Sequence, residues 1–478
     1  MYQRFGLFVA GEWRQAKSGA KAAVISPVTE APLGEAPVAS VADTEEALRA
    51  AEAGLKAWRA TPAFTRADAL HVIADEMIRR TGEAARMISS ETGKPLAQAQ
   101  REWVLTVDQF RWYAEEARRI YGRIVESRVP GGRFEVSHEP VGVSAAFTAW
   151  NFPAALVARK VAPALAAGCS VIVRPSSQTP GVAMVIVDCC RAGNLPAGAI
   201  NLVIGPTGAT YAPIMASKTV RKVSLTGSTR VGQQMIRDAA DTMKKVSMEL
   251  GGNAPLIVYD DADLETALNV AVPTKFANSG QVCVTPDRFY VHESLHDDFV
   301  QGFAARAQAI KLGDGLDSSV GMGPLINASR FAEIEGVVAA AIRAGAKVVT
   351  GGARAPGFNV GHFFEPTVLT DVTDDMQVMV EENFGPIAAI TRFRTDDEAI
   401  ERANACDMGL SAYAFTRSPT RARRTVAELK AGMVGVNSFA LAASEAPFGG
   451  TNFSGMGREG GVEGIRDYLD VKLAQVVF

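Results

Sequence analysis

The chain has 478 residues, of which 47% are hydrophobic and 21% charged, proportions that are ordinary for a globular protein and predict two or three domains with large cores. Its formal net charge is only -3 and no basic run stands out, which argues against a nucleic-acid partner. No run of about 18 or more uncharged apolar residues is present, so no membrane-spanning helix is expected.

The five cysteines are odd in number and include no Cys-x-x-Cys pair, a pattern that argues for a reducing compartment and against structural zinc or a disulfide framework. The segment around Arg4 and Glu12 mixes charged and aromatic residues without an apolar core, so the N-terminus is interpreted as mature sequence and not as a signal peptide. The histidines include no His-Glu-x-x-His motif, and no metal site is expected. These features predict a cytoplasmic protein.

The first part of the chain is predicted to contain short strands and turns over residues 1–40 and then a run of helices. Apolar residues at helical spacing predict four helices, the first of them capped by Asp43, over residues 43–55, 66–81, 82–92 and 95–121.

Residues 123–138 form two alternating runs separated by Val129-Pro-Gly-Gly132, which is a hairpin pattern. A lone hairpin is marginally stable in water. The last residues, 470–478, are strand-like as well. Hairpin and tail are therefore predicted to form a small sheet that another subunit completes.

From Val141 the pattern changes to alternating strands and helices, which indicates a parallel sheet with helices on its faces. The strands are predicted at residues 141–147, 170–174, 200–204, 222–225 and 246–250. Ligands bind beyond the carboxyl ends of such strands. A second alternating block from residue 255 to 437 predicts a second α/β domain.

Cys283 is the candidate nucleophile of this second domain. Asn278, Ser279 and Gly280 interrupt the preceding helical pattern, so the cysteine is expected on a bend, where its thiol is exposed. By itself the signal is weak, because most single cysteines are small core residues. A cysteine–histidine hydrolase has no supporting motif in the sequence.

Other candidates also have two interpretations. Glu249, at the end of a strand, is either a turn cap or a general base with a raised pKa. Asn151 is either a turn residue or an oxyanion donor. The turn Gly227-Ser228 between a strand and a helix suits a pyrophosphate but is also ordinary for such turns. Gly455-Met-Gly-Arg-Glu-Gly460 matches a dinucleotide fingerprint, yet it follows a loop and is interpreted as a glycine-rich turn.

Together these motifs occur in one order across nearly the whole chain: Asn151 in Trp-Asn-Phe-Pro, Glu249 in Met-Glu-Leu-Gly-Gly, Cys283 in Gly-Gln-Val-Cys, Glu382 in Glu-Glu-Asn-Phe-Gly-Pro and the Pro447-Phe-Gly-Gly450 turn. The set resembles the aldehyde dehydrogenase superfamily, most closely its bacterial succinate-semialdehyde dehydrogenases. The resemblance implies an α/β fold with two parallel-sheet, Rossmann-like domains and a small β bridging and oligomerisation element. The implied parts are a cofactor domain (1–121 and 141–251), a catalytic domain (252–447) and a bridging sheet (122–140 and 465–478), assembled as homodimers or homotetramers.

The resemblance also implies a reaction, the NAD(P)-dependent oxidation of an aldehyde to an acid. Cys283 adds to the aldehyde, the Asn151 amide and the Cys283 N–H hold the oxyanion, and Glu249 activates the water that hydrolyses the thioester. The residues that match cofactor positions are Thr148, Trp150, Arg174, Ser177, Gly227, Ser228, Glu382 and Phe384.

Two departures from the family pattern concern the cofactor, which is expected to be NADP or NAD. Arg174 stands where lysine is usual, and Ser177 stands where NAD-preferring members often have glutamate. Serine removes a carboxylate that would repel a 2′-phosphate, and Arg174 is suited to pair with that phosphate. NADP is therefore expected to be accepted, and a comparison of kcat/KM for the two cofactors tests whether it is preferred to NAD. Ala149 also replaces the usual proline before Trp150.

The resemblance implies a small aldehyde substrate, a semialdehyde such as succinate semialdehyde, with Arg159, Phe152 and Phe448 lining its tunnel. In the succinate-semialdehyde branch an arginine at position 159 helps to bind the distal carboxylate, but Ala277 stands where a second arginine is expected. Residues 440–444 are also more apolar than in that branch. A dehydrogenase of a longer or less polar aldehyde is the alternative, and a non-catalytic dinucleotide-binding or structural protein is the alternative of another class.

Overall fold

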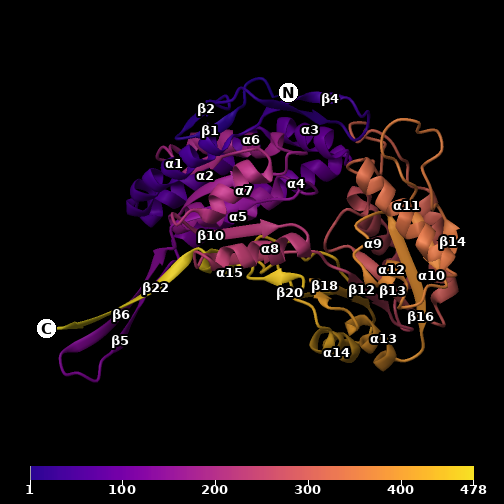
Figure 1. Cartoon of the computed structure of the whole chain (residues 1–478). Helices are drawn as coiled ribbons and strands as arrows, with labels where there is room; N and C mark the ends of the chain where they lie inside the picture. The colour runs from indigo at the N-terminus through magenta and orange to yellow at the C-terminus, as the bar shows by residue number, and fades with distance from the viewer. Residues whose placement is uncertain (1) are drawn as a thin grey trace.

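The computed structural model describes residues 2–478, which begin with short strands and a group of helices (Figure 1). The strands are β1 (Leu7–Val9), β2 (Glu12–Arg14), β3 (Lys21–Ile25) and β4 (Pro32–Pro37), and the helices are α1 (Val41–Ala60), α2 (Ala63–Arg79), α3 (Thr81–Thr92) and α4 (Leu96–Ala117). The expected cap of the first helix was wrong by three residues. Ser40 is the N-cap, and the Asp43 carboxylate completes a capping box by accepting from the Ser40 N–H at 2.9 Å.

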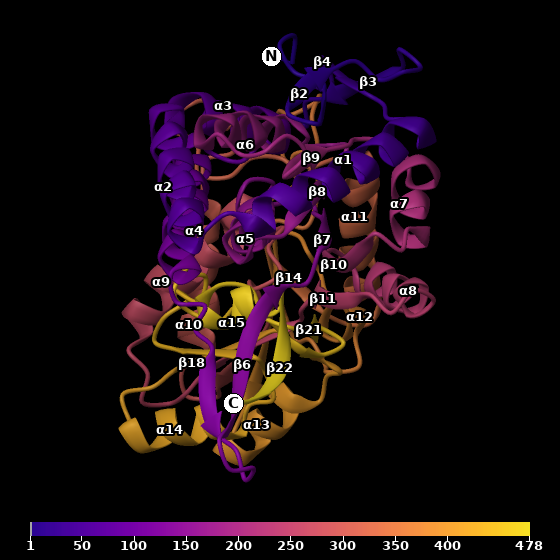
Figure 2. The ribbon, with the colours of Figure 1, turned by 90° about the vertical axis from the view of Figure 1, so that its left-hand side faces the viewer.

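The first large sheet has the strand order β2-β1-β9-β8-β7-β10-β11-β21. Its parallel strands are β7 (Val143–Phe147), β8 (Ser170–Arg174), β9 (Ile200–Leu202), β10 (Val220–Thr226) and β11 (Lys245–Glu249). The helices that connect them are α5 (Ala155–Ala167), α6 (Gly181–Cys190), α7 (Thr207–Ala216) and α8 (Thr229–Ala240). One face of the sheet packs on α2 to α6 and the other on α1, α7 and α8, as Figure 2 shows. The strand order reverses between β7 and β10, so a crevice is expected at their carboxyl ends.

The second large sheet has the order β14-β15-β16-β13-β12-β18-β19 and is parallel except for β14. Its strands are β12 (Ala254–Val258), β13 (Pro286–His292), β14 (Lys347–Thr350), β15 (Thr367–Thr370), β16 (Ile387–Phe393), β18 (Ser411–Phe415) and β19 (Met433–Val436). The main helices around it are α9 (Leu264–Phe276), α10 (His296–Gln308), α11 (Ala328–Arg343), α13 (Asp396–Asn404) and α14 (Pro419–Glu428). Separate apolar clusters fill its two faces.

The predicted hairpin and tail form a three-stranded antiparallel sheet that extends away from the body (Figure 1). The strands are β5 (Arg123–Glu126), β6 (Gly132–Pro140) and β22 (Leu469–Val477), and β22 pairs with β6 along its whole length. Large apolar side chains of this arm are exposed, including Val471 and Leu473. Its completion by another subunit stays a prediction.

The predicted fold class is confirmed: an α/β chain with two parallel-sheet units and a small β element. The domain limits stay a prediction, although β21 (Gly455–Met456) joins the first sheet from outside the expected range. Within residues 2–478, no helix combines the length and apolarity needed to cross a membrane. The chain passes from β11 to β12 within a few residues, so the carboxyl edge of one sheet adjoins the amino edge of the other.

Candidate active site

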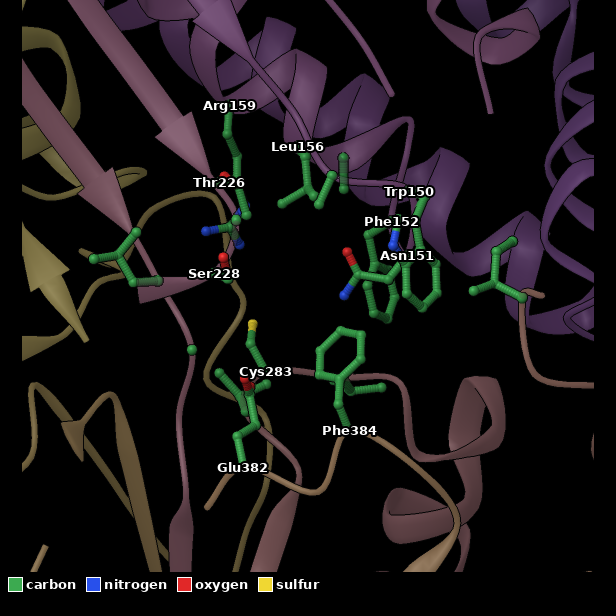
Figure 3. A pocket seen from close by; sticks show the side chains of 18 of the residues that line it. Trp150, Asn151, Phe152, Leu156, Arg159, Thr226, Ser228, Cys283, Glu382 and Phe384 are labelled. Atoms are coloured by element: carbon green, nitrogen blue, oxygen red, sulfur yellow. The ribbon is translucent and has the colours of Figure 1, made fainter. Parts of the chain in front are cut away.

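A cavity of about 440 Å³ lies at this junction and receives side chains from both sheet units (Figure 3). The sequence-predicted residues that line it are Trp150, Asn151, Phe152, Arg159, Gly227, Ser228, Cys283, Glu382, Phe384 and Phe448. Four predicted residues, Thr148, Arg174, Ser177 and Glu249, are not part of its lining. The structure therefore brings the nucleophile candidate and the oxyanion candidate into one space.

Cys283 lies between a short 3-10 turn, η2 (Ala277–Gly280), and the start of β13. Asn278 and Ser279 have φ values of 48° and 58°, so the helix ends in a sharp turn that turns the chain toward the cavity. The buried Gln281 fixes this turn, because its Nε2 donates to Asn278 O at 3.0 Å and its Oε1 accepts from Ile326 N at 2.9 Å. The predicted bend is confirmed, and the thiol projects from it (Figure 3).

The surroundings of the Cys283 thiol disfavour its ionised form. Burial first, and then the carboxylates of Glu382 and Glu249, raise its pKa to about 12, against the opposing effect of Arg159. Thiolate is the reactive form of cysteine. A reaction at this sulfur therefore needs a nearby group that takes up the thiol proton.

Asn151 follows β7 and faces the cavity from the wall opposite Cys283 (Figure 3). Its Nδ2 donates to Gln281 O at 3.1 Å, and its Oδ1 is buried without a hydrogen-bond partner. Gln281 O also accepts from Asn278 Nδ2 at 3.2 Å. The Asn151 amide can therefore give up this bond to a ligand without leaving the carbonyl unpaired.

Glu249 ends β11 and lies just outside the cavity lining, at 3% exposure, with neither carboxylate oxygen hydrogen-bonded. Burial raises its pKa well above the usual range, and the neighbouring Glu459 adds to the effect. A Cβ at Gly449 would come within 2.7 Å of Glu249 Oε1, so glycine at that position leaves room for the carboxylate. Of the three residues assigned to the reaction, Cys283 and Asn151 line the cavity. Glu249 lies outside the lining but close enough to act on the Cys283 thiol.

A buried pair beside Glu249 was missed from the sequence. Lys160, on α5, is fully buried, donates from Nζ to Thr226 Oγ1 at 2.7 Å and forms an ion pair with Glu459. Glu459 lies in the segment that was interpreted as a glycine-rich turn. One signal was available, because Arg159 and Lys160 are charged residues inside an otherwise apolar helix.

The cofactor candidates form two groups. Trp150, Gly227, Ser228, Glu382 and Phe384 line the cavity, and Trp150 packs edge-on against Phe384 with ring centroids 5.5 Å apart. The Glu382 carboxylate accepts from Gly252 N at 3.0 Å, and burial raises its pKa to about 8.

The second group lies beyond the carboxyl end of β8. Arg174 donates from Nη2 to Gly205 O at 3.1 Å and has no acidic partner among residues 2–478, while Ser177 is exposed. Burial lowers the Arg174 pKa, although the guanidinium stays charged. Thr148, at the end of β7, has a buried Oγ1 without a partner. These features suit a dinucleotide that extends from β8 toward the cavity.

The substrate side of the cavity contains an unpaired cation. Arg159 is only 6% exposed, its Nη2 donates to Ala442 O at 3.3 Å, and its Nη1 is buried without a partner. Its guanidinium lies 4.1 Å from the centroid of the Phe448 ring, and no carboxylate of the described chain pairs with it. Arg159 therefore does not form an ion pair on the surface of its helix, which would be an ordinary role for an arginine in a helix.

Several residues of the lining were not anticipated. Gln109 donates from Nε2 to Ser444 Oγ at 3.0 Å and leaves its Oε1 unpartnered beside the substrate wall. The first two turns of α11 contribute Arg330 and Glu333 on the side of Phe384. Gln109, Arg330 and Glu333 lie far in sequence from any of the motifs. Their spacing along the helices is that of ordinary surface or core residues, so no sequence signal marked them.

Comparisons with known proteins agree with this geometry. A sequence model described as "Aldehyde dehydrogenase family" matches residues 13–474. A 3-sulfolactaldehyde dehydrogenase of Pseudomonas putida is 44% identical over 97% of this chain and 95% of its own length. A succinate-semialdehyde dehydrogenase [NADP(+)] of Escherichia coli is 42% identical over 97% of this chain and 96% of its own. The crystal structure of succinate-semialdehyde dehydrogenase from Burkholderia pseudomallei superposes with a TM-score of 0.97 at 41% identity, covering 99% of this chain and 98% of that one.

Proposed function

The chain belongs to the aldehyde dehydrogenase family, and on that premise we propose that its substrate is an aldehyde with a distal anionic group, such as succinate semialdehyde. NAD(P)-dependent oxidation of an aldehyde to an acid follows from the family membership itself. The observation that supports the finer proposal is Arg159, a buried guanidinium of the Cys283 cavity that forms no ion pair with any carboxylate of the described chain. An unpaired buried cation is costly, so an anionic ligand stabilises it.

In the proposed mechanism the Cys283 thiol gives its proton to water, its Sγ adds to the aldehyde carbon, and the electron pair of the carbonyl bond moves to oxygen. The oxyanion accepts hydrogen bonds from Asn151 Nδ2 and from the Cys283 backbone N–H. Removing one such donor costs about 10²–10³ in rate. The oxyanion then collapses to a thioester on Cys283 with loss of hydride, for which a nicotinamide held beside Trp150 and Phe384 would supply the acceptor.

Glu249 is the proposed base. Its raised pKa makes it a better proton acceptor near neutral pH than an ordinary glutamate, because an effective base has a pKa close to the working pH. The space beside Gly449 allows the carboxylate to turn toward the thioester and take a proton from the attacking water. Lys160 and Glu459 lie next to it, and the Lys160 cation favours its ionised form.

The cofactor proposal is that NADP is bound and preferred. The fit is supported by the glycine at 251, where a Cβ would collide with the Glu382 carboxylate, and by Arg174, which lacks an acidic partner in the described chain. Arg174 and Ser177 would hold the 2′-phosphate, with no carboxylate nearby to repel it. The ring and ribose contacts are assigned to Thr148, Trp150, Gly227, Ser228, Glu382 and Phe384.

A panel of aldehydes tests the proposal through the absorbance of the reduced cofactor. We expect kcat/KM for succinate semialdehyde and glutarate semialdehyde to exceed that for butanal by 10-fold or more, since a charge-assisted hydrogen bond is worth about 1.5–3 kcal/mol. Equal values for charged and neutral aldehydes would favour the alternative, a longer or less polar aldehyde. No observation favours the non-catalytic alternative.

The arm formed by β5, β6 and β22 supports a further proposal, that the chain works as a homodimer or homotetramer whose partner covers the exposed apolar side chains of this arm. The five cysteines are unpaired, which supports a reducing compartment such as the cytoplasm. Sedimentation of a stable monomer at micromolar concentration would contradict the assembly.

A further inference from the structure

Two lysine–carboxylate pairs are enclosed behind opposite walls of the cavity. Lys94 Nζ lies 2.6 Å from Glu102 Oε2, and Lys275 Nζ lies 2.6 Å from Asp287 Oδ1, with every side chain at most 3% exposed. None of the four lines the cavity. A buried ion pair is weak evidence for stability, because desolvation offsets much of the attraction. What these pairs contribute therefore depends on the further hydrogen bonds that their four side chains make.

The first pair bonds the segment that carries Asn151. Lys94 Nζ also donates to Asn151 O at 2.7 Å and lies 4.0 Å from the centroid of the Phe152 ring. Glu102 Oε1 accepts from Ala154 N at 2.8 Å, at the start of α5. One ion pair thus contacts three of four consecutive residues between β7 and α5. It limits the backbone motion that would carry the Asn151 amide away from Cys283.

The second pair bonds the opposite wall. Asp287 Oδ2 accepts from Asn383 N at 3.0 Å, and Asn383 lies between Glu382 and Phe384. Phe384 has a φ of 46°, in the left-handed region that aromatic residues rarely occupy. A strained segment persists only when its surroundings hold it. The Asp287 bond is one of the contacts that do so.

We propose that the two ion pairs position different parts of the active site. Lys94 and Glu102 set the position of the oxyanion donor, whereas Lys275 and Asp287 set the position of the segment that holds the cofactor. The proposal rests on the roles assigned above to Asn151, Glu382 and Phe384. If the pairs only supported the fold, their loss would have similar kinetic consequences, because they are alike in length and burial.

The test uses two double variants that remove both charges of one pair, Lys94→Met/Glu102→Gln and Lys275→Met/Asp287→Leu. The glutamine keeps an acceptor for Ala154 N, so the first variant mainly loses the bond to Asn151 O. We expect its kcat to fall about 10- to 100-fold, as displacement of a catalytic group by about 1 Å can do, with the dissociation constant for NADP within about 2-fold of wild type. The second variant should raise that dissociation constant about 10-fold and lower kcat at saturating NADP by less than about 3-fold.

Equal losses of kcat in both variants, with unchanged NADP affinity, would overturn the proposal, and so would wild-type kinetics in either. Calorimetric titration with NADP needs no turnover, so it reports on the second pair even if no aldehyde is oxidised. If the wild type oxidised no aldehyde, that result would contradict the proposed function and not the positioning roles of the two pairs. Should a double variant fail to fold, the single variants Lys94→Met and Asp287→Leu, which remove the bonds to Asn151 O and to Asn383 N, must show the same division.

Discussion

Replacing Arg159 by methionine tests the substrate proposal most directly. The guanidinium is buried, and its Nη1 is the unpaired donor of the substrate wall. Methionine keeps a long, flexible apolar side chain that can still pack against Phe448. The variant therefore removes the charge and the hydrogen bonds while the tunnel wall stays largely filled.

The expected magnitude follows from one lost charge-assisted bond. At about 1.5–3 kcal/mol, and with 1.4 kcal/mol for each factor of ten, kcat/KM for succinate semialdehyde should fall about 10- to 100-fold. Arg159 also opposes the burial and the carboxylates that raise the Cys283 pKa. Its loss raises that pKa further, so the acidic limb of the pH–rate profile should move to higher pH for every aldehyde.

The assay compares succinate semialdehyde with butanal, which has the same chain length and no charge, for wild type and variant. The pKa effect acts on both substrates, so the ratio of their kcat/KM values isolates the binding of the distal anion. The exposed substitution Arg394→Met serves as a control. A ratio that changes less than about 3-fold would refute an anion site at Arg159.

Cys283→Ser should abolish aldehyde oxidation while leaving NADP affinity unchanged, and full turnover would contradict its role as nucleophile. Glu249→Gln should lower steady-state kcat by about 10²-fold or more and leave a burst of reduced cofactor, because the acyl-enzyme forms but its hydrolysis lacks a base. Because burial raises the Glu249 pKa, the base is protonated at low pH, and wild-type kcat should rise with pH through that pKa; a kcat that does not rise from acidic to alkaline pH would contradict this. Ser177→Glu should reduce the ratio of kcat/KM for NADP over NAD by about 10-fold or more, since a carboxylate repels the 2′-phosphate, and an unchanged ratio would place the phosphate elsewhere. Leu473→Asp on β22 should shift sedimentation toward monomer while Lys472→Gln does not, and no shift would argue against the arm as an interface.

The sequence identified elements and motifs wherever the information was local. The hairpin turn at Val129-Pro-Gly-Gly132, the strand–helix alternation from Val141 and the bend before Cys283 all depend on nearest neighbours, and each is confirmed. The helix start at Ser40 was missed by a small margin for a local reason: Asp43 is a member of the capping box, and either residue type suits the cap.

Contacts between residues that are far apart in the sequence could not be predicted. Lys160 meets Glu459 across 299 residues, and Glu459 belongs to a turn whose glycines dominated its interpretation. Lys94 is near Glu102 in sequence, but the function of that pair depends on Asn151, which is 57 residues away. No periodicity reports such contacts, because they arise from the packing of segments that are far apart in the sequence.

The distribution of unsatisfied polar atoms links these observations. Buried polar groups in folded proteins are nearly always hydrogen-bonded, and a group left without a partner costs about 1–3 kcal/mol. In the described chain, unpartnered buried atoms at or beside the cavity include those of Gln109, Asn151, Arg159, Glu249, Arg330 and Glu459. The group contains amides, guanidiniums and carboxylates, which together offer acceptors and donors to a ligand. The fold leaves these groups unpaired on the cavity side and holds Asn151 through Lys94 from the other side. It is less stable at this place as a result, and a polar substrate that pairs with these groups would restore the lost stability.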